Sequence, residues 1–430
     1  MRRTWLVVFG DALAFWVSFL AMLFIRFDSS FPRLALAEHF LPFTILFAAW
    51  LLCFYLFGLY DLLNIKPTIP YAKRFALALL ASAALGVLLF YFVPFFNIAP
   101  KTNLLLEIVG FALLSFGARR AVYSLFSKQI RRKAILSGET PYMRELYRLI
   151  MENPQLGLCV VSFTKDLRQA LQNSPDRKDA VLIFEESAGE IPKGEMASLY
   201  SNQAEILDVA EAYERYFYKI PVNYISQSWI VKNLKARKNI AYAFFSRLSD
   251  IILSALIFIV SSPFWIAGAI SVYFYDRGPI FYTHDRVGLN GKTFRMYKLR
   301  SMVTEAEKNG AVWAKARDPR ITPPGKILRK LHIDEIPQML NVLKGDLSMV
   351  GPRPERPEFV LKLEEKIPYY DLRHVIRPGF TGWAQIKYKY ARSELTSREK
   401  FEYDLYYLKN RNIFMDFGII LRTIQIIFTH

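Results

Sequence analysis

Two adjacent acids, Asp334 and Glu335, precede an expected helix in a chain whose net charge is +18. Proline suits the first turn of a helix and glycine suits its end. We therefore predict a helix from about Ile336 to Lys344, with Pro337 in its first turn and Gly345 after its last. Free N–H groups and the dipole at a helix start favour a carboxylate anion. An ionised Asp334 could act as a nucleophile or bind a cation, whereas a solvated helix cap is the commoner role.

Arginine and lysine are dense in two segments that precede these acids, residues 277–300 and 317–330. Arginine binds phosphate oxygens through two N–H groups at once, and lysine acts as a point charge. A basic surface facing anionic lipid has the same composition. We expect both roles, and the candidate substrate contacts are Lys298, Arg300, Arg320 and Arg353. Arg353 stands between two prolines, which stiffen the segment that carries its guanidinium.

The composition indicates a membrane protein, because 53% of the residues are hydrophobic and 35 are phenylalanine. Four apolar stretches of about 20 residues each could cross a bilayer as helices, near 5–26, 40–62, 75–96 and 104–126. We read residues 1–128 as a helical transmembrane region, in which the last span is weakened by Glu107. The distribution of cations places both ends of this region in the cytoplasm. A cleaved signal peptide is not expected.

The basic charge and the two cysteines narrow the choice of partners. A net charge of +18 suits nucleic acid, anionic lipid or phosphate-rich substrates. We expect no nucleic acid, since the sequence contains no nucleic-acid-binding motif that we recognise. Cys53 and Cys159 are too few for a disulfide framework or a cysteine metal site. A lipid bilayer and phosphate-bearing substrates therefore remain.

Short apolar runs alternate with charged segments from residue 133 to residue 230, which predicts a small α/β domain with a parallel sheet. Its first loop, Ser137-Gly138-Glu139, lacks the Gly-x-Gly pattern of dinucleotide-binding loops. We therefore expect this Rossmann-like domain to serve in regulation or assembly, for example of a homodimer, rather than to bind a nucleotide.

An apolar stretch at about 250–275 is interrupted by Ser261, Ser262 and Pro263. Proline removes a backbone donor, and neighbouring hydroxyl groups can satisfy the carbonyls that it frees. Two topologies follow: a kinked helix that crosses the membrane, or a re-entrant helix that enters and leaves on one side. The last apolar segment, 413–428, carries Asp416 and Arg422 and is read as an amphipathic helix at the membrane surface.

Several ordered motifs in residues 240–430 carry a resemblance to a known family. They include Tyr-Lys-Leu-Arg-Ser-Met (297–302), Asp-Pro-Arg-Ile-Thr (318–322), the acid pair, Gly-Pro-Arg-Pro (351–354) and Pro-Gly-Phe-Thr-Gly-Trp-Ala-Gln (378–385). This region resembles the bacterial sugar transferases, the polyprenyl-phosphate hexose-1-phosphate transferases, and looks most like a subgroup associated with exopolysaccharide synthesis. The resemblance implies a mainly α catalytic domain with a re-entrant membrane helix broken at Ser262 and Pro263. It places that domain on the cytoplasmic face of the bacterial inner membrane.

The resemblance also implies a two-step reaction. Asp334 would attack the sugar-linked phosphate of a UDP-sugar, and the phosphosugar would then pass to a polyprenyl phosphate such as undecaprenyl phosphate. Mg²⁺ held with help from Glu335 suits the charge of a diphosphate. Glucose, galactose and N-acetylated amino sugars all remain open as the sugar.

A membrane-bound nucleotide-sugar dehydratase or epimerase is the alternative enzyme. Its N-terminal helices and Rossmann-like domain could give a similar pattern. Such an enzyme needs a dinucleotide loop and a Tyr-x-x-x-Lys pair, and this sequence contains neither. A transporter or scaffold would leave the acids and Arg353 unexplained.

Overall fold

The protein is described from a computed structural model that covers residues 2–27, 33–61, 65–92, 101–234, 240–304, 306, 318–388 and 394–429. The chain forms two compact units, Met1–Val209 and Ala210–His430. The first unit holds a helix bundle and a parallel sheet. The residues expected to do chemistry all belong to the second unit.

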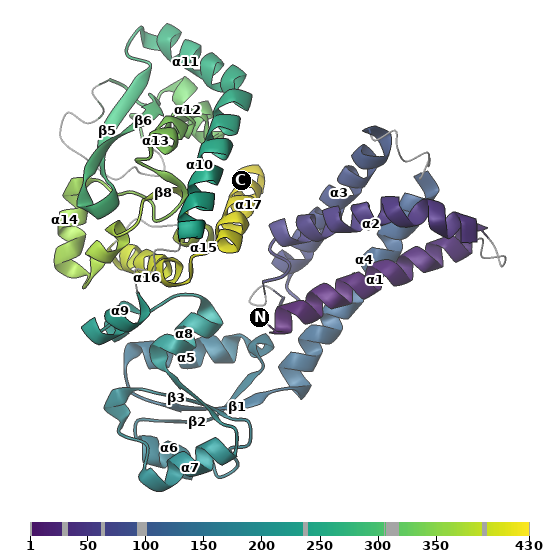
Figure 1. Cartoon of the computed structure of the whole chain (residues 1–430), viewed down its shortest axis with the longest axis vertical. Coiled ribbons are helices and arrows are strands. Elements are labelled where there is room, and N and C mark those ends of the chain that lie inside the picture. Colours follow the sequence, from purple (N-terminus) through teal and green to yellow (C-terminus); the bar gives the residue numbers. More distant parts are fainter. Residues whose placement is uncertain are drawn as a thin grey trace. The chain divides into compact units, whose positions relative to one another are not determined.

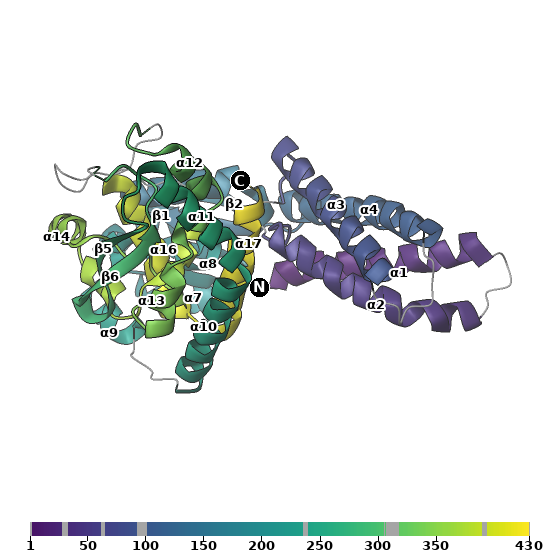
Figure 2. The same ribbon diagram turned by 90° about the horizontal axis from the view of Figure 1, so that it is seen from above.

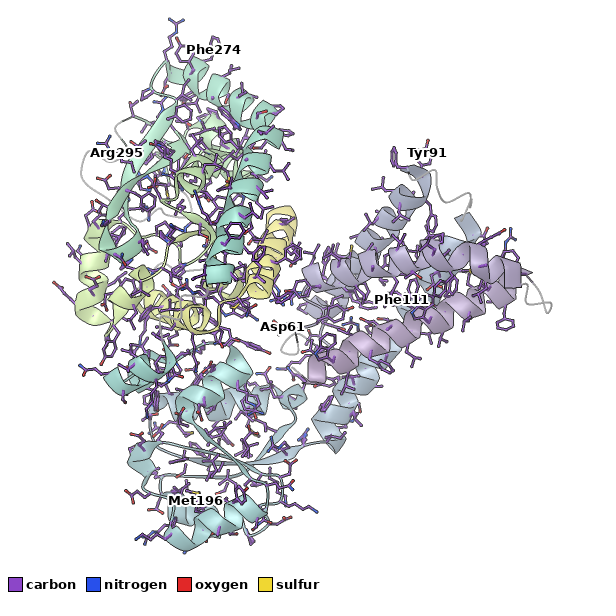
Figure 3. All side chains as sticks on the ribbon, viewed as in Figure 1. Asp61, Tyr91, Phe111, Met196, Phe274 and Arg295 are labelled. Carbon is purple, nitrogen blue, oxygen red and sulfur yellow. The ribbon has the colours of Figure 1, made fainter. Side chains whose placement is uncertain are left out.

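Four long helices form the bundle (Figures 1 and 2). They are α1 (Arg2–Phe27), α2 (Arg33–Leu56), α3 (Ile69–Phe92) and α4 (Lys101–Ser124). Phe111 lies among them (Figure 3), with its ring centroid 5.9 Å from Phe15 and 5.1 Å from Trp50. Many large apolar side chains on the outside of the bundle are exposed. In length and composition, α1, α2 and α3 suit a membrane crossing, and so does α10 (Ile240–Val260) of the second unit. These helices indicate a membrane protein.

Buried polar pairs join α1 to α4. The Ser18 hydroxyl donates to Glu107 Oε1 at 2.6 Å, and Arg119 forms a fully buried ion pair with Asp11. The expected fourth span is therefore helical and places Glu107 inside the bundle. Among the described residues, α4 does not join the helices that are apolar enough to span a membrane. A buried ion pair of this kind is costly to break, because either partner alone would be an unpaired charge.

A four-stranded parallel sheet completes the first unit and confirms the predicted sheet. Its strands are β1 (Arg132–Ser137), β2 (Leu158–Thr164), β3 (Val181–Phe184) and β4 (Glu205–Asp208), in the order β2-β1-β3-β4. Three helices connect them: α5 (Pro141–Glu152), α6 (Leu167–Gln172) and α7 (Lys193–Ser201). In Figure 1, α6 and α7 cover one face and α5 covers the other. Ile135, Leu182 and Leu199 are fully buried between the sheet and the α6–α7 layer.

The loop from β1 to α5, where a dinucleotide phosphate would bind in a Rossmann domain, is filled by the Glu185 carboxylate. The backbone N–H groups of Glu139 and Thr140 donate to Glu185 Oε2 at 3.1 and 3.4 Å. A Cβ at Gly138, whose φ is +155°, would lie 2.5 Å from the same carboxylate. The helix start is thus satisfied by the protein's own anion. This geometry agrees with the missing glycine fingerprint.

In the second unit, the apolar stretch breaks where the sequence predicted it. The two helices are α10 (Ile240–Val260) and α11 (Ser262–Asp276). Pro263 lies in the first turn of α11, where its missing N–H is tolerated. Trp265 stacks on Phe258, with ring centroids 5.0 Å apart, and its indole N–H donates to the Phe258 carbonyl at 3.3 Å. The chain therefore turns sharply at the break, and α11 runs at an angle to α10 (Figure 1).

Both helices of this pair pack against the rest of the second unit, the body formed by residues 281–429. In α10, Arg247 donates to the Val342 carbonyl at 2.7 Å, and Asp250 accepts the Met349 N–H at 2.7 Å. In α11, Val272 is buried in a cluster with Leu328. Elsewhere the two helices expose large apolar side chains, including Phe274 at the end of α11 (Figure 3).

The remaining elements are mainly helical, with two small sheets. In chain order they are β5 (Phe281–Val287), β6 (Thr293–Leu299), α12 (Pro323–Lys330), α13 (Gln338–Lys344), β7 (Ser348–Val350), α14 (Pro357–Lys366), β8 (Gly379–Thr381), α15 (Trp383–Lys387), α16 (Glu394–Asn410) and α17 (Ile413–Thr429). Strands β5 and β6 are antiparallel, and β7 and β8 are parallel. Met339 and Val342 of α13 are fully buried in the main core. In the predicted amphipathic helix α17, Asp416 is buried and accepts the hydroxyls of Tyr407 and Tyr242, each at 2.8 Å.

Residues 210–234 pack with the C-terminal elements. This segment contains α9 (Gln227–Asn233) and most of α8 (Val209–Phe217). The Ile220 N–H donates to the Glu402 carbonyl, and the Trp383 indole donates to the Tyr218 carbonyl, both at 3.0 Å. The sequence analysis predicted an α/β domain that ends at residue 230 and a catalytic domain that begins at residue 240. The compact unit that holds the site begins earlier, at Ala210.

Candidate active site

The antiparallel pair β5–β6 forms one wall of the site. Alternate side chains of a strand share one face, so Tyr282, His284 and Arg286 lie in a row. Lys298 of β6 is directly opposite Tyr282. The Tyr282 and His284 rings stack, with centroids 5.3 Å apart. This row brings an aromatic surface and cations to the same place.

A single 3₁₀ turn, Ile333–Glu335, carries both acids. His332 precedes it in the left-handed region, with φ of 56°, a conformation that is uncommon for a residue with a side chain. The following helix, α13, begins at Gln338, two residues later than predicted, and ends at Gly345 in the left-handed conformation as predicted. The acids therefore lie in their own turn and not in the first turn of the helix.

Asn341 of α13 joins this turn to the β5–β6 wall. Its side chain is fully buried, accepts the Tyr297 N–H at 3.0 Å and donates to the Arg295 carbonyl at 2.7 Å. These bonds hold β6 beside α13 and so bring Lys298 to Glu335. Sequence reasoning did not identify Asn341, because a lone polar residue in an apolar helix gives no signal of its partner.

Glu335 is held between two cations. Its Oε1 lies 2.7 Å from Lys298 Nζ and 2.8 Å from Arg353 Nη2. Burial alone would raise the pKa of Glu335, but Arg353 and Lys298 outweigh burial and hold that pKa well below its usual range. Arg353 also donates to Gln385 at 3.0 Å. The structure thus brings three of the predicted residues together and keeps Glu335 ionised.

Asp334, in contrast, is buried and makes no hydrogen bond or ion pair within the described structure. Burial and, after it, the charge of Glu335 raise the pKa of Asp334 above its usual range. The expected stabilisation of an Asp334 anion assumed that the acids lie in the first turn of the helix, whereas they lie in a separate 3₁₀ turn before it. The two neighbouring carboxylates therefore differ in environment. The charge of Glu335 is balanced by two cations, whereas Asp334 has no hydrogen bond or ion pair within the described structure.

Asp334 and Glu335 line a cavity of about 570 Å³. Most of the other polar side chains around it are cationic or aromatic: Tyr282, His284, Arg286, Lys298, Arg300, Arg320, Arg329, His332 and Arg356. Glu355 is a third acid in the lining. Phe281 and Phe359 contribute apolar surface. The combination of several arginines with three acids and aromatic rings suits a phosphate-bearing ligand.

The predicted arginines have different roles in this cavity. Arg300 is buried and ion-paired with Asp276 at the end of α11. Arg320 lines the cavity, but its guanidinium is held by Asp318 at 2.9 and 2.7 Å and by the Ala306 carbonyl at 2.8 Å. The guanidinium of Arg320 is therefore engaged by the protein itself in this structure.

His284 is a cavity residue that sequence reasoning missed. Both of its ring nitrogens are buried and unpartnered within the described structure. Burial, Arg286 and Lys298 lower the pKa of His284 to about 2, so its ring is neutral at physiological pH. A neutral imidazole offers one donor and one acceptor. The pattern Tyr-x-His-x-Arg along one strand face was the available signal.

A buried ion pair supports the segment that carries Arg353. Arg373 donates to the Arg353 carbonyl at 2.9 Å and pairs with Asp404 of α16 at 3.1 Å. Both side chains are less than a tenth exposed. Burial raises the pKa of Asp404 to about 6 despite Arg373 and Lys400. Arg373 acts on the site through Arg353, since it does not line the cavity.

The apolar helices and the cavity define the class first: a membrane protein with two adjacent acids in a cavity lined by cations. Comparison with known proteins then gives the family. The bacterial sugar transferase family model matches residues 241–430. A putative undecaprenyl-phosphate N-acetylgalactosaminyl 1-phosphate transferase of Bacillus subtilis (strain 168) is 45% identical over 138 residues, which are 32% of this chain and 77% of that protein. The chain belongs to the bacterial sugar transferase family.

Two further relatives match the same region. A UDP-N-acetylgalactosamine-undecaprenyl-phosphate N-acetylgalactosaminephosphotransferase of Aeromonas hydrophila is 43% identical over 188 residues, which are 44% of each chain. A UDP-glucose:undecaprenyl-phosphate glucose-1-phosphate transferase of Klebsiella pneumoniae is 39% identical over 182 residues, which are 42% of this chain and 39% of that protein. The match thus spans less than half of each of these two relatives. Neither relative supports the dehydratase or epimerase alternative.

Replacing Arg373 by methionine should destabilise the second unit by about 3–5 kcal/mol, because Asp404 would be left buried without its ion pair. Denaturant unfolding in detergent micelles measures this loss. R373M/D404N should recover part of it, since no unpaired charge remains. R295M, at an exposed position, should change the free energy of unfolding by less than about 0.5 kcal/mol. A loss for R373M as small as that of R295M would show that the pair is not structural.

Proposed function

We propose that the protein transfers a sugar-1-phosphate from a UDP-sugar to a polyprenyl phosphate, such as undecaprenyl phosphate, through a covalent intermediate on Asp334. The observation that carries this proposal is the difference between two adjacent carboxylates. Asp334 is buried and, within the described structure, has no ion pair in a cavity rich in cations, whereas the charge of Glu335 is balanced by Lys298 and Arg353. The names of the relatives, all of which act on undecaprenyl phosphate with a sugar phosphate, support the same reaction.

In the first step, a carboxylate oxygen of Asp334 attacks the phosphorus that bears the sugar. The bond from that phosphorus to the bridging oxygen breaks, and uridine monophosphate leaves with the electron pair. In the second step, a phosphate oxygen of the lipid attacks the same phosphorus, and the bond to Asp334 breaks. The products are a polyprenyl-diphosphate sugar and a free Asp334 carboxylate. One carboxylate can thus serve a soluble donor and a lipid acceptor in turn.

The cations at the site have distinct tasks in this scheme, and all of those named here except Arg353 line the cavity. Lys298 and Arg353 keep Glu335 ionised and fix its position. Their positive charges also balance the negative charge that Glu335 places beside Asp334. Arg286 and Arg356, close to the stacked Tyr282 and His284 rings, suit the diphosphate and base of a nucleotide. The Arg356 guanidinium also donates to the Tyr282 hydroxyl at 3.1 Å. We assign donor binding to this part of the cavity.

Mg²⁺ fits this site as an ion shared with the substrate. Within the described ranges, no cluster of three or more His, Cys, Asp or Glu side chains could hold a metal alone. Mg²⁺ commonly binds one or two carboxylates together with substrate phosphates and water. Glu335 could supply such a carboxylate through Oε2, since Lys298 and Arg353 both bond to its Oε1. The ion would neutralise charge on the diphosphate.

The helix pair α10–α11 is proposed to be re-entrant, with its break at Ser262 and Pro263 inside the membrane. If α10 alone crossed the bilayer, Arg247 and Asp250 would lie near the centre of the membrane, yet both bond to the body that carries the site. The second arm, α11, packs on that same body through Val272 and Leu328. We place the body on the cytoplasmic face of the bacterial inner membrane, where nucleotide sugars are made.

The product of this reaction is the first lipid-linked sugar of a surface glycan, and exopolysaccharide is the proposed pathway. The sugar itself is best found with a panel of UDP-glucose, UDP-galactose and their N-acetylated amino-sugar counterparts. Release of uridine monophosphate that depends on polyprenyl phosphate would identify the donor. Failure of every member of the panel would count against the proposed function.

Cysteines introduced at Ile240 and Arg277, which are exposed at the two ends of α10–α11, should both be labelled from the cytoplasmic side by a membrane-impermeant reagent. The reason is that α10 and α11 both pack against the same part of the second unit, so their outer ends lie on the same side of the membrane. Labelling in right-side-out and inside-out vesicles makes the measurement, and a cysteine at Lys73, in the predicted cytoplasmic part of the bundle, is the control. Labelling of the two flanking positions from opposite sides would establish a full crossing.

Incubation with the right UDP-sugar and Mg²⁺, without lipid, should add one sugar phosphate to Asp334. Peptide mass spectrometry locates the adduct, and polyprenyl phosphate should discharge it. D334A should lose at least about a thousandfold in turnover, as expected when a unique nucleophile is removed. D346N, at a nearby acid outside the cavity, is the matched control and should retain activity. An intact reaction by D334A would exclude the covalent route.

The rate of adduct formation should rise with pH through the pKa of Asp334, because only the carboxylate attacks. Since burial and Glu335 raise that pKa, the acid limb should lie above the usual range for aspartate. E335Q removes the negative charge that helps to raise the pKa of Asp334. It also frees Lys298 and Arg353 to stabilise the Asp334 anion. The normalised acid limb of E335Q should therefore move to lower pH, although its metal-dependent rate falls. A limb that stays in place would show that Asp334 does not control the profile.

A further inference from the structure

In the described part of the chain, His284 lines the cavity with both of its ring nitrogens unsatisfied. It lies in the middle of β5, between Tyr282 and Arg286 on the same face of the strand. Its Nδ1 and Nε2 atoms are both buried. A buried polar atom without a hydrogen-bond partner costs free energy. We therefore expect this ring to meet its partners in a ligand of the cavity.

The surroundings of His284 determine which partners it needs. Burial and, after it, the charges of Arg286, Lys298 and Arg356 lower the pKa of this ring, so the ring is neutral at physiological pH. A neutral imidazole offers one N–H donor and one nitrogen acceptor. The Tyr282 ring stacks on one face of the imidazole, whereas both nitrogens lie on its edge. The ligand must therefore present both an acceptor and a donor to that edge.

A phosphate group does not meet this requirement by itself. The oxygens of an ionised phosphate are acceptors, so they satisfy the N–H of a neutral imidazole and leave its other nitrogen without a donor. A hydroxyl group both donates and accepts. The donor substrate of the proposed reaction carries hydroxyl groups on two parts, its hexose and its ribose. His284 suits one of these parts, whereas the arginines of the cavity suit the diphosphate.

Two other neutral side chains of the lining are already engaged by arginines. The Tyr282 hydroxyl accepts a hydrogen bond from Arg356 at 3.1 Å, and the Ser301 hydroxyl accepts one from Arg329 at 2.8 Å. His284 has both a donor and an acceptor available within the described structure. It is therefore better suited than either hydroxyl to bind an uncharged polar group of the substrate.

The position of His284 favours the hexose over the ribose. Lys298 lies opposite Tyr282, the stacking partner of His284, and its Nζ bonds to Glu335 at 2.7 Å. Glu335 is next to Asp334 in the chain, and it lies close enough to His284 for its charge to affect the pKa of that ring. In the proposed reaction, a single oxygen joins the hexose to the phosphorus that Asp334 attacks, whereas the ribose lies beyond the second phosphate. A side chain beside Glu335 is therefore nearer to the hexose.

We propose that His284 hydrogen-bonds a hydroxyl group of the donor hexose and so contributes to the choice of sugar. This inference rests on the proposed function and deepens it, because it assigns a residue to the sugar itself. One ring nitrogen accepts the hydroxyl proton, and the other donates to a neighbouring oxygen of the sugar. Binding of the correct sugar then satisfies both buried nitrogens.

A series of UDP-sugar analogues, in which each hexose hydroxyl is removed in turn, tests this contact with the full chain in nanodiscs. With wild type, the analogue that lacks the bound hydroxyl should lose about tenfold in kcat/KM. H284F keeps an aromatic ring and removes both nitrogens. It should lose a similar factor with the complete sugar, and less than about twofold more with that analogue, because the contact is already gone. Equal further losses of H284F and wild type for every analogue would overturn the proposal.

The matched control for these kinetics is T283V. Thr283 is exposed on the opposite face of β5 and does not line the cavity. T283V should therefore respond to each analogue as wild type does. H284Q restores a donor and an acceptor, so it should recover part of the kcat/KM that H284F loses. Failure of H284Q to recover any of it would count against a hydrogen bond at this position.

Binding measurements separate the hexose from the ribose. UMP carries the ribose but no hexose, and D334A serves as the background in which no adduct forms. Adding H284F to that background should weaken binding of the UDP-sugar by about tenfold and leave binding of UMP within about twofold. A matching loss for UMP would place His284 at the ribose and overturn the assignment to the hexose. UDP-sugar binding by wild type without any transfer to lipid would refute the proposed function and leave this contact standing.

Discussion

The ion pairs of Lys298 and Arg353 with one oxygen of Glu335 are the interaction on which the site depends. Two adjacent carboxylates in a buried turn repel each other, and each raises the pKa of the other. The two cations remove this conflict by fixing the negative charge on Glu335. Asp334 is then left without a partner, with a raised pKa and access to the cavity. The difference between the two acids comes from their neighbours, because the residues themselves are nearly alike.

Most of the second unit can be understood as support for that arrangement. Asn341 ties β6 to α13 and so brings Lys298 to the acids. Arg373 and Asp404 hold the backbone at Arg353, between its two prolines. The first arm of the broken helix pair anchors the strand that leads to this segment, since Asp250 accepts the Met349 N–H. The same core therefore positions the acids, the cations and the membrane-facing helices.

Local features were predictable from sequence where the cause is local. Pro263 and its serines predicted the helix break, Gly345 predicted the end of α13, and apolar runs predicted the parallel sheet. The family motifs located the acids and Lys298. What the sequence could not supply depends on residues distant in the chain. The raised pKa of Asp334 follows from burial by several elements, and the engagement of Arg320 by Asp318 competes with its expected use on a substrate.

The carboxylate of Glu185 has a consequence for inhibitor design. In the middle domain it occupies the helix start where a dinucleotide phosphate would bind in related folds, and it bonds to the loop around Gly138. A nucleotide-like inhibitor would have to displace a buried anion there before gaining any contact. Such compounds should therefore be steered toward the cavity of the second unit. A scaffold that needs an open phosphate loop has no place to bind at this domain.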